Sequence, residues 1–344
     1  MVAPHNALRK PVSSGDQAES VMRVVAEKPI AVRRSFADRF ADAGFRWLIT
    51  LCALSVLAIV GFFVYELIVN SQPSLKEFGW HFFVGQDWDP VSGEFGALPF
   101  IYGTLVSSFL ALLIAVPLSL GVAIYVTEMA PGWVRTPISF LMELLAAIPS
   151  VIYGLWAIFV LAPILRVYVG PALAKSLGWT GFFSGPVYGI GMLAAGVILS
   201  IMIVPIIASI TRDVMAAIPQ TQREAVLALG ATRWEMVRIA VLRNARTGII
   251  GAIILGLGRA LGETMAVTMV IGNRPDITKS LFAPAYTMAS VIANEFTEAT
   301  GTLYASAIVE VGLALFLVTL IVNALAQMLV WMTTRGMPSR AHGQ

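Results

Sequence analysis

Stretches of about twenty apolar residues recur along this chain, and they constrain its fold more than any other feature. Each is long enough to cross the hydrocarbon core of a bilayer, which is about 30 Å thick. The composition agrees, because 58% of the residues are hydrophobic and 12% are charged, whereas about a quarter of the residues of a soluble domain are charged. The sequence therefore predicts an all-α integral membrane protein. We expect six transmembrane helices, at roughly residues 46–69, 99–126, 137–165, 187–211, 247–272 and 303–333.

The distribution of Lys and Arg predicts how these helices are oriented. Eight of these residues lie between residues 1 and 46, and six lie between Arg212 and Arg246. The three segments on the other side of the membrane together hold five. Because cytoplasmic loops carry the excess of positive charge, both termini are expected in the cytoplasm. Orientation accounts for the net charge of +3 better than nucleic-acid binding does.

The chain is expected to have four parts. Residues 1–32 form a disordered cytoplasmic tail, because they are rich in charge, Ser, Pro and Ala. Residues 33–98 hold a short amphipathic helix at the membrane surface, the first transmembrane helix and an outer loop. The main transmembrane domain covers residues 99–333, and residues 334–344 form a second cytoplasmic tail. The start does not resemble a signal peptide, and the single cysteine, Cys52, excludes an internal disulfide.

The outer loop, about residues 70–98, is long for a connector and rich in aromatic residues. Its members are Phe78, Trp80, Phe82, Phe83, Trp88 and Phe95. One interpretation is a belt of aromatic side chains at the membrane interface. The other is a folded outer cap that meets a partner protein.

A polar block from Thr221 to Arg246 separates two apolar spans. A helix here places Glu224, Leu227 and Ala228 on one face, and Gly230 predicts a turn before a second helix that begins near Thr232. The block is either an amphipathic loop held at the membrane by its arginines or a docking helix for a cytoplasmic ATPase.

Arg259 and Glu263 lie within the fifth predicted span. Each costs about 2.5–3.5 kcal/mol to insert near the centre of a bilayer. Their i, i+4 spacing lets them pair on one helical face. The pair either stabilises the bundle or lies on a permeation path, where a guanidinium offers two-pronged hydrogen bonding to an oxyanion. Thr264 and Thr268 could add hydroxyl donors.

Other motifs are weaker or missing. Gly256, Gly258 and Gly262 superficially resemble a dinucleotide fingerprint, but no strand precedes them, and close helix packing explains them better. There is no phosphate-binding G-x-x-x-x-G-K-[ST] motif, no arrangement of a nucleophile with a base, and no His cluster for a metal. We therefore expect a chain that is not an enzyme, that binds neither metal nor cofactor, and that does not itself use ATP through such a motif.

Several stretches resemble a known family. Glu224-Ala225 followed by Gly230 resembles the cytoplasmic EAA loop of ABC-importer permeases. ELLAAIPSVIYGLW from Glu143 and GRALGETMAVTMVIGN from Gly258 resemble permeases of bacterial phosphate importers. EFGALPFIYGTL, from Glu94, is more similar to the PstC-type family than to the PstA type. The resemblance runs from about Trp80 to Trp331.

This resemblance implies a type I ABC-importer permease (MetI-like) fold in the bacterial inner membrane. It implies a heterodimer with a PstA-type permease, two copies of a PstB-type ATPase and a PstS-type phosphate-binding protein. Transport residues would be Arg259 and Glu263, and coupling residues Glu224, Ala225 and Gly230. The sequence departs from the EAA pattern at Val226 and at Arg243, where the loop usually ends with proline. A permease for sulfate or molybdate, and a proton-coupled anion carrier using Glu263, are the alternatives.

Overall fold

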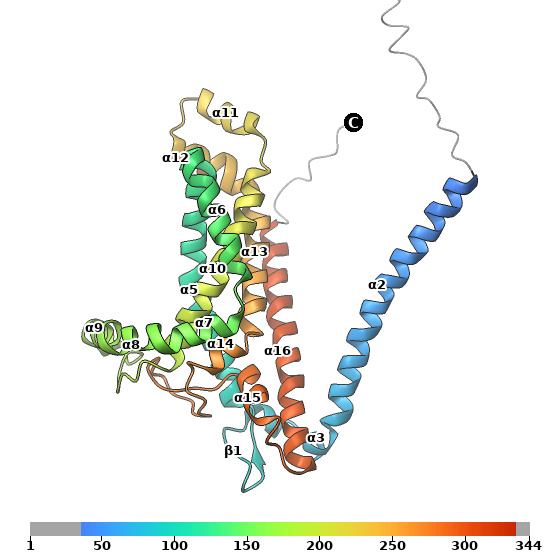
Figure 1. Ribbon diagram of the computed structural model, residues 1–344, viewed down its shortest axis with the longest axis vertical. Coiled ribbons are helices and arrows are strands. Elements are labelled where there is room, and N and C mark those ends of the chain that lie inside the picture. Colours follow the sequence, from blue (N-terminus) through green and yellow to red (C-terminus); the bar gives the residue numbers. More distant parts are fainter. Residues whose placement is uncertain (1–35, 335–344) are drawn as a thin grey trace, which may run out of the picture. The chain divides into compact units, whose positions relative to one another are not determined.

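The computed structural model describes the backbone of residues 36–334 and the side chains of residues 44–332. The chain divides into two units, one ending at Phe63 and one beginning at Val64. The second unit is built around a bundle of long helices (Figure 1).

In chain order, the described elements are α2 (Phe36–Asn70), α3 (Gln72–Phe78), α4 (His81–Val84), β1 (Trp88–Asp89), β2 (Glu94–Phe95), α5 (Leu98–Ile124), the π-helix η1 (Tyr125–Met129), α6 (Gly132–Ala147), α7 (Ser150–Trp156), the π-helix η2 (Ala157–Leu161), α8 (Ala162–Ile164), the π-helix η3 (Leu165–Val169), α9 (Gly170–Leu177), the 3₁₀-helix η4 (Gly178–Thr180), α10 (Met192–Ala216), α11 (Gln220–Ala228), α12 (Arg233–Met236), the π-helix η5 (Val237–Leu242), α13 (Arg243–Leu261), α14 (Met265–Thr268), α15 (Met288–Glu295) and α16 (Thr302–Thr334).

The prediction of six apolar spanning helices is confirmed for the described residues. They are Gly44–Asn70, Leu98–Met129, Ser150–Thr180, Met192–Ala216, Arg233–Leu261 and Thr302–Met332. The first, second and sixth agree closely with the predicted spans, and the fourth begins about one turn later than expected. The third and fifth differ more, because their helices break at places where the apolar run continues.

The third span begins later than predicted, since the apolar run from residue 137 is not one helix. α6 ends at Ala147, and Ile148 and Pro149 are extended. A residue that precedes proline is disfavoured in the helical region, because its backbone clashes with the proline ring. Ile148 therefore leaves the helix, and a new helix starts at Ser150.

The fifth span is displaced toward the N-terminus of the predicted one. It begins at Arg233, where the Thr232 hydroxyl accepts a hydrogen bond from the Glu235 amide and the Glu235 carboxylate accepts one from the Thr232 amide. This reciprocal pair is a capping box, which fixes a helix start. The helix then runs through η5 into α13 and ends at Leu261.

Helix α2 covers both the predicted surface helix and the first span without a break, from Phe36 to Asn70. The separate amphipathic helix expected from residue 33 is therefore the first part of a longer helix. The side chains of Phe36 and Phe40 lie outside the described ones, so the membrane-surface location stays a prediction. The predicted tails, residues 1–32 and 335–344, lie outside the described residues.

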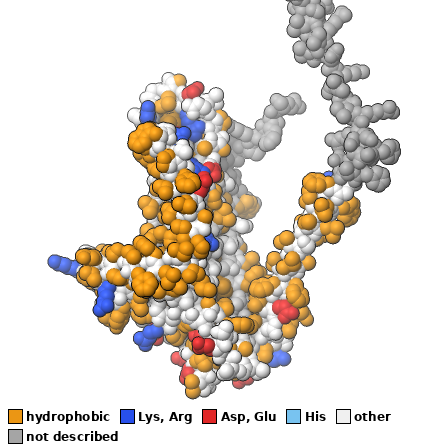
Figure 2. Space-filling view, in the orientation of Figure 1, with side chains coloured by type: hydrophobic (Ala, Val, Ile, Leu, Met, Phe, Trp, Pro, Cys, Tyr) orange, Lys and Arg blue, Asp and Glu red, His pale blue; other side chains and the backbone are white. Residues whose placement is uncertain are grey.

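Helix α10 is the most buried of the spanning helices in the second unit. Small residues let its neighbours approach closely, as is common between membrane helices. Its own Gly196 faces Leu110 of α5, and Gly248 and Gly256 of α13 face Val214 and Ile207 of α10. Outside this core, apolar side chains cover the middle of the bundle, and Lys and Arg side chains gather at its α11–α12 end (Figure 2).

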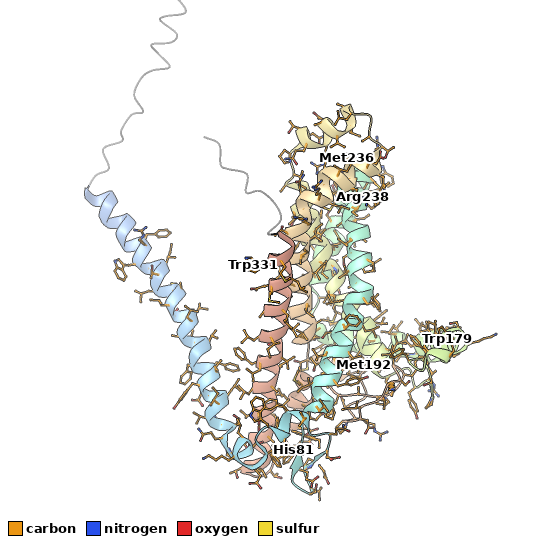
Figure 3. All side chains as sticks on the ribbon, turned by 180° about the vertical axis from the view of Figure 1, so that it is seen from behind. His81, Trp179, Met192, Met236, Arg238 and Trp331 are labelled. Atoms are coloured by element: carbon orange, nitrogen blue, oxygen red, sulfur yellow. The ribbon has the colours of Figure 1, made fainter. Side chains whose placement is uncertain are left out.

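The loop after α2 folds into a compact cap, as one of the two interpretations predicts. The Trp88 ring contacts Phe95 and Phe100 edge-on, with centroids 4.9 and 4.8 Å apart. Trp88 Nε1 and the Tyr304 hydroxyl both donate to Glu295 Oε2, each at 2.8 Å. The cap lies at one end of the second unit, where Figure 3 labels His81, and Met236 and Arg238 mark the opposite end. The C-terminal end of α16 lies on the α11–α12 side (Figure 1).

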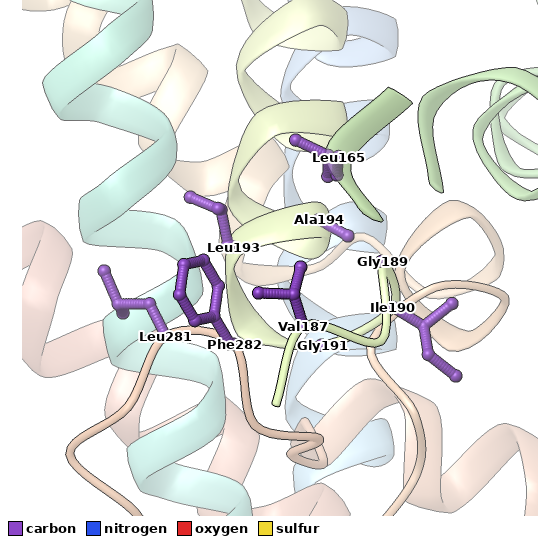
Figure 4. A pocket seen from close by; sticks show the side chains of 9 residues that line it. All are labelled: Leu165, Val187, Gly189, Ile190, Gly191, Leu193, Ala194, Leu281 and Phe282. Atoms are coloured by element: carbon purple, nitrogen blue, oxygen red, sulfur yellow. The ribbon is translucent and has the colours of Figure 1, made fainter. Parts of the chain in front are cut away.

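The first turn of α10 is held by main-chain carbonyls from the segment that follows α14. Its amides at Gly191, Met192 and Leu193 donate to the carbonyls of Val270, Ala283 and Leu281 at 2.8, 3.1 and 2.8 Å. The first amides of a helix have no partner within it, so these bonds satisfy them. A small apolar pocket lies at this join, between the start of α10 and the side chain of Phe282 (Figure 4).

Candidate translocation site

Arg259 and Glu263 lie where the fifth span is interrupted. Arg259 is in the last turn of α13, where the helix dipole favours a cation. Glu263 lies in the break between α13 and α14. The Arg259 Nη2 and Glu263 Oε2 atoms are 3.8 Å apart, so the expected ion pair forms. The pair does not lie along one continuous helix, however: α13 ends at Leu261, and Glu263 Oε1 accepts a hydrogen bond at 3.3 Å from the amide of Ala266 in the first turn of α14.

The two members of this pair are unequally accessible. The Glu263 side chain is 5% exposed, whereas the Arg259 side chain is 42% exposed. A buried carboxylate without a cation would be costly, and Arg259 supplies that cation; among the described residues its guanidinium makes no other ion pair or hydrogen bond. Interrupted membrane helices occur where the backbone is buried in protein or lines a cavity. The geometry therefore offers one accessible guanidinium, held from behind by a buried anion.

The two threonines of this segment differ in what they can donate. The Thr268 hydroxyl donates to the Thr264 carbonyl at 2.7 Å, so its proton is engaged within the chain. The Thr264 hydroxyl makes one longer bond of 3.4 Å to the Gly262 carbonyl. Thr264 is consequently the freer donor of the two.

Tyr153 also belongs to this site, although the sequence reasoning did not single it out. It is buried in α7, donates its hydroxyl to the Leu145 carbonyl at 2.8 Å, and lies within electrostatic reach of Arg259. The next residue, Gly154, faces Ala266 and Met269 so closely that a Cβ would meet both. Two interrupted spans thus meet at the pair. The aromatic residue within the Glu143–Trp156 stretch was the signal available in the sequence.

Glu310, a second carboxylate within a span, was also missed. It lies in α16 and is completely buried, with the Ser74 hydroxyl of α3 beside it. Neither of its oxygens has a hydrogen-bond partner among the described residues. An ionisable residue inside an apolar run is itself a functional signal, and residue 310 stands eight positions into the sixth predicted span.

The second candidate site is the α11 loop, which we define as residues 220–232. As predicted, Glu224, Leu227 and Ala228 share a face, and this face is exposed. Gly230 makes the expected turn with φ +84°, and its amide donates to the Leu227 carbonyl at 3.0 Å. Leu229, at the tip of the loop, is 88% exposed. The loop therefore presents Glu224, Leu227 and Leu229 to solvent together.

Comparison with known proteins places this arrangement among transport permeases. Residues 115–331 match the family described as binding-protein-dependent transport system inner membrane component. The chain is 47% identical to the phosphate transport system permease protein PstC of Mesorhizobium japonicum, over 89% of this chain and 96% of that protein. It is 44% identical to the Haemophilus influenzae protein of the same name, over 87% of this chain and 96% of that protein.

Solved structures share the fold at lower identity. A bacterial ABC transporter involved in the import of the acidic polysaccharide alginate has a TM-score of 0.59 at 17% identity, covering 86% of this chain and 99% of its own. An inward-facing MetNI methionine ABC transporter has a TM-score of 0.50 at 22% identity, covering 70% of this chain and 95% of its own. The arrangement of spans is therefore that of MetI-like ABC-importer permeases.

Proposed function

We propose that this chain forms part of the path by which inorganic phosphate crosses the bacterial inner membrane. It belongs to the binding-protein-dependent transport system inner membrane component family and, within it, to the PstC-type permeases. The observation that supports this proposal is the half-exposed Arg259 guanidinium, which pairs with the buried carboxylate of Glu263 at a helix break. A planar guanidinium can bind two oxygens of a tetrahedral anion at once. Glu263 offsets part of its charge, so that the anion is bound but released.

The α11 loop transmits the work of a separate ATPase. Glu224 and Ala225 lie on its exposed face, and the Gly230 turn presents Leu229 to solvent. In this proposal the face docks into a cleft of a PstB-type ATPase. Two copies of this ATPase are present in the complex, and they bind the ATP and Mg²⁺. The remaining partners are a PstA-type permease, which completes the path, and a PstS-type binding protein, which delivers phosphate to the outer side.

The function is tested by transport in proteoliposomes that contain this chain with its companion permease and ATPase. We expect phosphate uptake only when ATP is present on the membrane face that carries the ATPase and the binding protein is present on the opposite face. Phosphate should also stimulate ATP hydrolysis. Uptake driven by a proton gradient without ATP would favour the proton-coupled carrier instead. Stimulation by sulfate or molybdate, but not by phosphate, would favour the related oxyanion permease.

The orientation is tested by labelling two single cysteines in a Cys52→Ser background. Val91, at the tip of the cap hairpin, is 96% exposed, and Leu229, at the tip of the α11 loop, is 88% exposed. With the cap outside and both termini in the cytoplasm, V91C should react with an impermeant maleimide in intact spheroplasts. L229C should react only after the membrane is permeabilised. The two sites serve as controls for each other, and the reverse pattern would contradict the proposed topology.

A further inference from the structure

One residue of the α11 loop points the other way from its neighbours. Arg223 is buried, whereas Glu224 and Ala225 beside it are exposed. Its Nη2 atom lies 3.0 Å from Glu128 Oε1, and the two side chains are 11% and 6% exposed. Glu128 belongs to η1, which continues α5. A buried ion pair is tolerated only when its remaining donors are also satisfied.

The other hydrogen bonds of Arg223 reach the last turn of α10 and the residues that follow it. Nη2 donates to the Met215 carbonyl at 2.8 Å, and Nη1 donates to the Ile218 carbonyl. Met215 lies in the last turn of α10, and Ile218 lies two residues beyond its end, so the guanidinium holds the point where the chain leaves α10 for α11. One side chain thereby fastens α11 to the ends of two spanning helices. A lysine could not do this equally well, because the fixed fork of donors is lost.

From α10 the connection continues to the candidate site. Gly248 and Gly256 of α13 leave no room for a side chain against Val214 and Ile207 of α10. Arg259 follows Gly256 by less than one turn of the same helix. Closely packed helices transmit displacement, because their interiors are dense and poorly compressible.

We propose that Arg223, with Glu128, is a positioning pair that transmits movement of the α11 loop to α5 and α10, and through α10 to Arg259. The inference rests on the proposed function, in which the α11 loop contacts an ATPase. It assigns Arg223 a task separate from docking, because its side chain faces the membrane helices and not the exposed face.

The test uses the assembled complex in proteoliposomes, with Arg223→Gln and Glu128→Gln as the variants. Three quantities are measured: retention of the ATPase on purification, the rate of ATP hydrolysis, and phosphate taken up per ATP. We expect the ATPase to be retained and to hydrolyse ATP, while uptake per ATP falls about tenfold, within the usual range of coupling effects. Arg223→Lys should lose less, since it keeps the charge opposite Glu128.

A charge-swapped variant, Arg223→Glu with Glu128→Arg, should not restore coupling. A carboxylate at position 223 cannot donate to the Met215 and Ile218 carbonyls, whereas a simple ion pair would be restored. Arg238→Gln is the matched control, since Arg238 is an exposed arginine at the same end of the molecule (Figure 3). It should leave uptake per ATP unchanged.

Normal uptake per ATP in Arg223→Gln would overturn the inference. So would loss of the ATPase from that complex, because Arg223 would then only fold the docking loop. Both outcomes differ from failure of the proposed function itself, in which the wild-type complex shows no ATP-dependent phosphate uptake.

Discussion

Arg259→Gln is expected to abolish phosphate uptake while leaving the subunits assembled. Glutamine keeps two polar atoms but removes the charge and the fork of donors that would hold the anion. A hydrogen bond to a charged group is worth about 1.5–3 kcal/mol, so uptake should fall at least about tenfold. The measurement is initial phosphate uptake in cells that lack the native protein, normalised to the amount of complex in the membrane.

Several variants separate anion binding from a structural role of the pair. Arg259→Lys should be intermediate, since the charge remains without the two-pronged geometry. Arg274→Gln is the matched control, because Arg274 is an exposed arginine paired with Asp276 at 3.3 Å, and exposed pairs contribute about 0–1 kcal/mol. Near-normal uptake by Arg259→Gln would return the pair to a structural role. Loss of assembly in that variant would do the same.

The swap of charges between Arg259 and Glu263 is less informative than Glu263→Gln. The swap places a large guanidinium in the position that is 5% exposed and removes the oxygen that accepts from the Ala266 amide. Glutamine keeps an oxygen for that amide and removes only the negative charge. If Glu263 serves to weaken anion binding, Glu263→Gln should assemble, bind phosphate more tightly and turn over more slowly.

Gly230→Val is expected to uncouple ATP hydrolysis from uptake. Open space surrounds a Cβ at this position, so the effect does not come from a clash. It comes from φ +84°, a backbone conformation that costs an L-residue roughly 1–2 kcal/mol and a β-branched residue more. The turn should therefore relax and move Leu229, which lowers phosphate uptake per ATP while the complex still inserts.

The controls for this variant isolate its location. Gly301 has φ +91° and equally open surroundings, but it lies just before α16 at the cap end. Gly301→Val imposes the same local strain there and should leave coupling intact. Gly230→Asn should be milder than Gly230→Val, since Asn tolerates the left-handed region. Unchanged uptake in Gly230→Val would remove the docking role from the α11 loop.

The α11 loop could be predicted from the sequence because its signals are local. A glycine supplied the turn at Gly230, and the spacing of Thr232 and Glu235 is that of a capping box. Both features depend only on residues within one or two turns, so they form independently of how the rest of the chain packs. The six spans were predictable for a similar reason, since length and apolarity alone decide whether a helix can cross a bilayer.

The two helix breaks could not be placed from the sequence with equal certainty. Membrane helices tolerate an internal proline when neighbours satisfy the freed carbonyls, so Pro149 alone does not show where α6 ends. At the second break, the spacing of Arg259 and Glu263 suits a continuous helix. The carboxylate of Glu263 instead accepts from the Ala266 amide of α14, and α7 packs against the same segment through Gly154.

The cap illustrates a longer-range limit. Its aromatic residues are consistent with an interfacial belt as well as with a folded core, and the deciding partner is distant in the chain. Glu295 accepts from both Trp88 and Tyr304, and Phe95 stacks on Tyr304 with centroids 5.4 Å apart. No local sequence pattern predicts the contact between Trp88 and Glu295, which are more than two hundred positions apart.

The main-chain contact between the start of α10 and the segment after α14 limits how the sequences of such chains can evolve. Its three hydrogen bonds connect main-chain atoms only, so most substitutions of the residues involved leave every bond available. Gly191 is the exception, because a Cβ there would meet the carbonyls of Phe282 and Ala283. Adding or removing one residue between Val270 and Ala283 would instead shift the acceptors relative to α10 and break the set together. Relatives should therefore vary in side chains across this stretch while keeping its length constant.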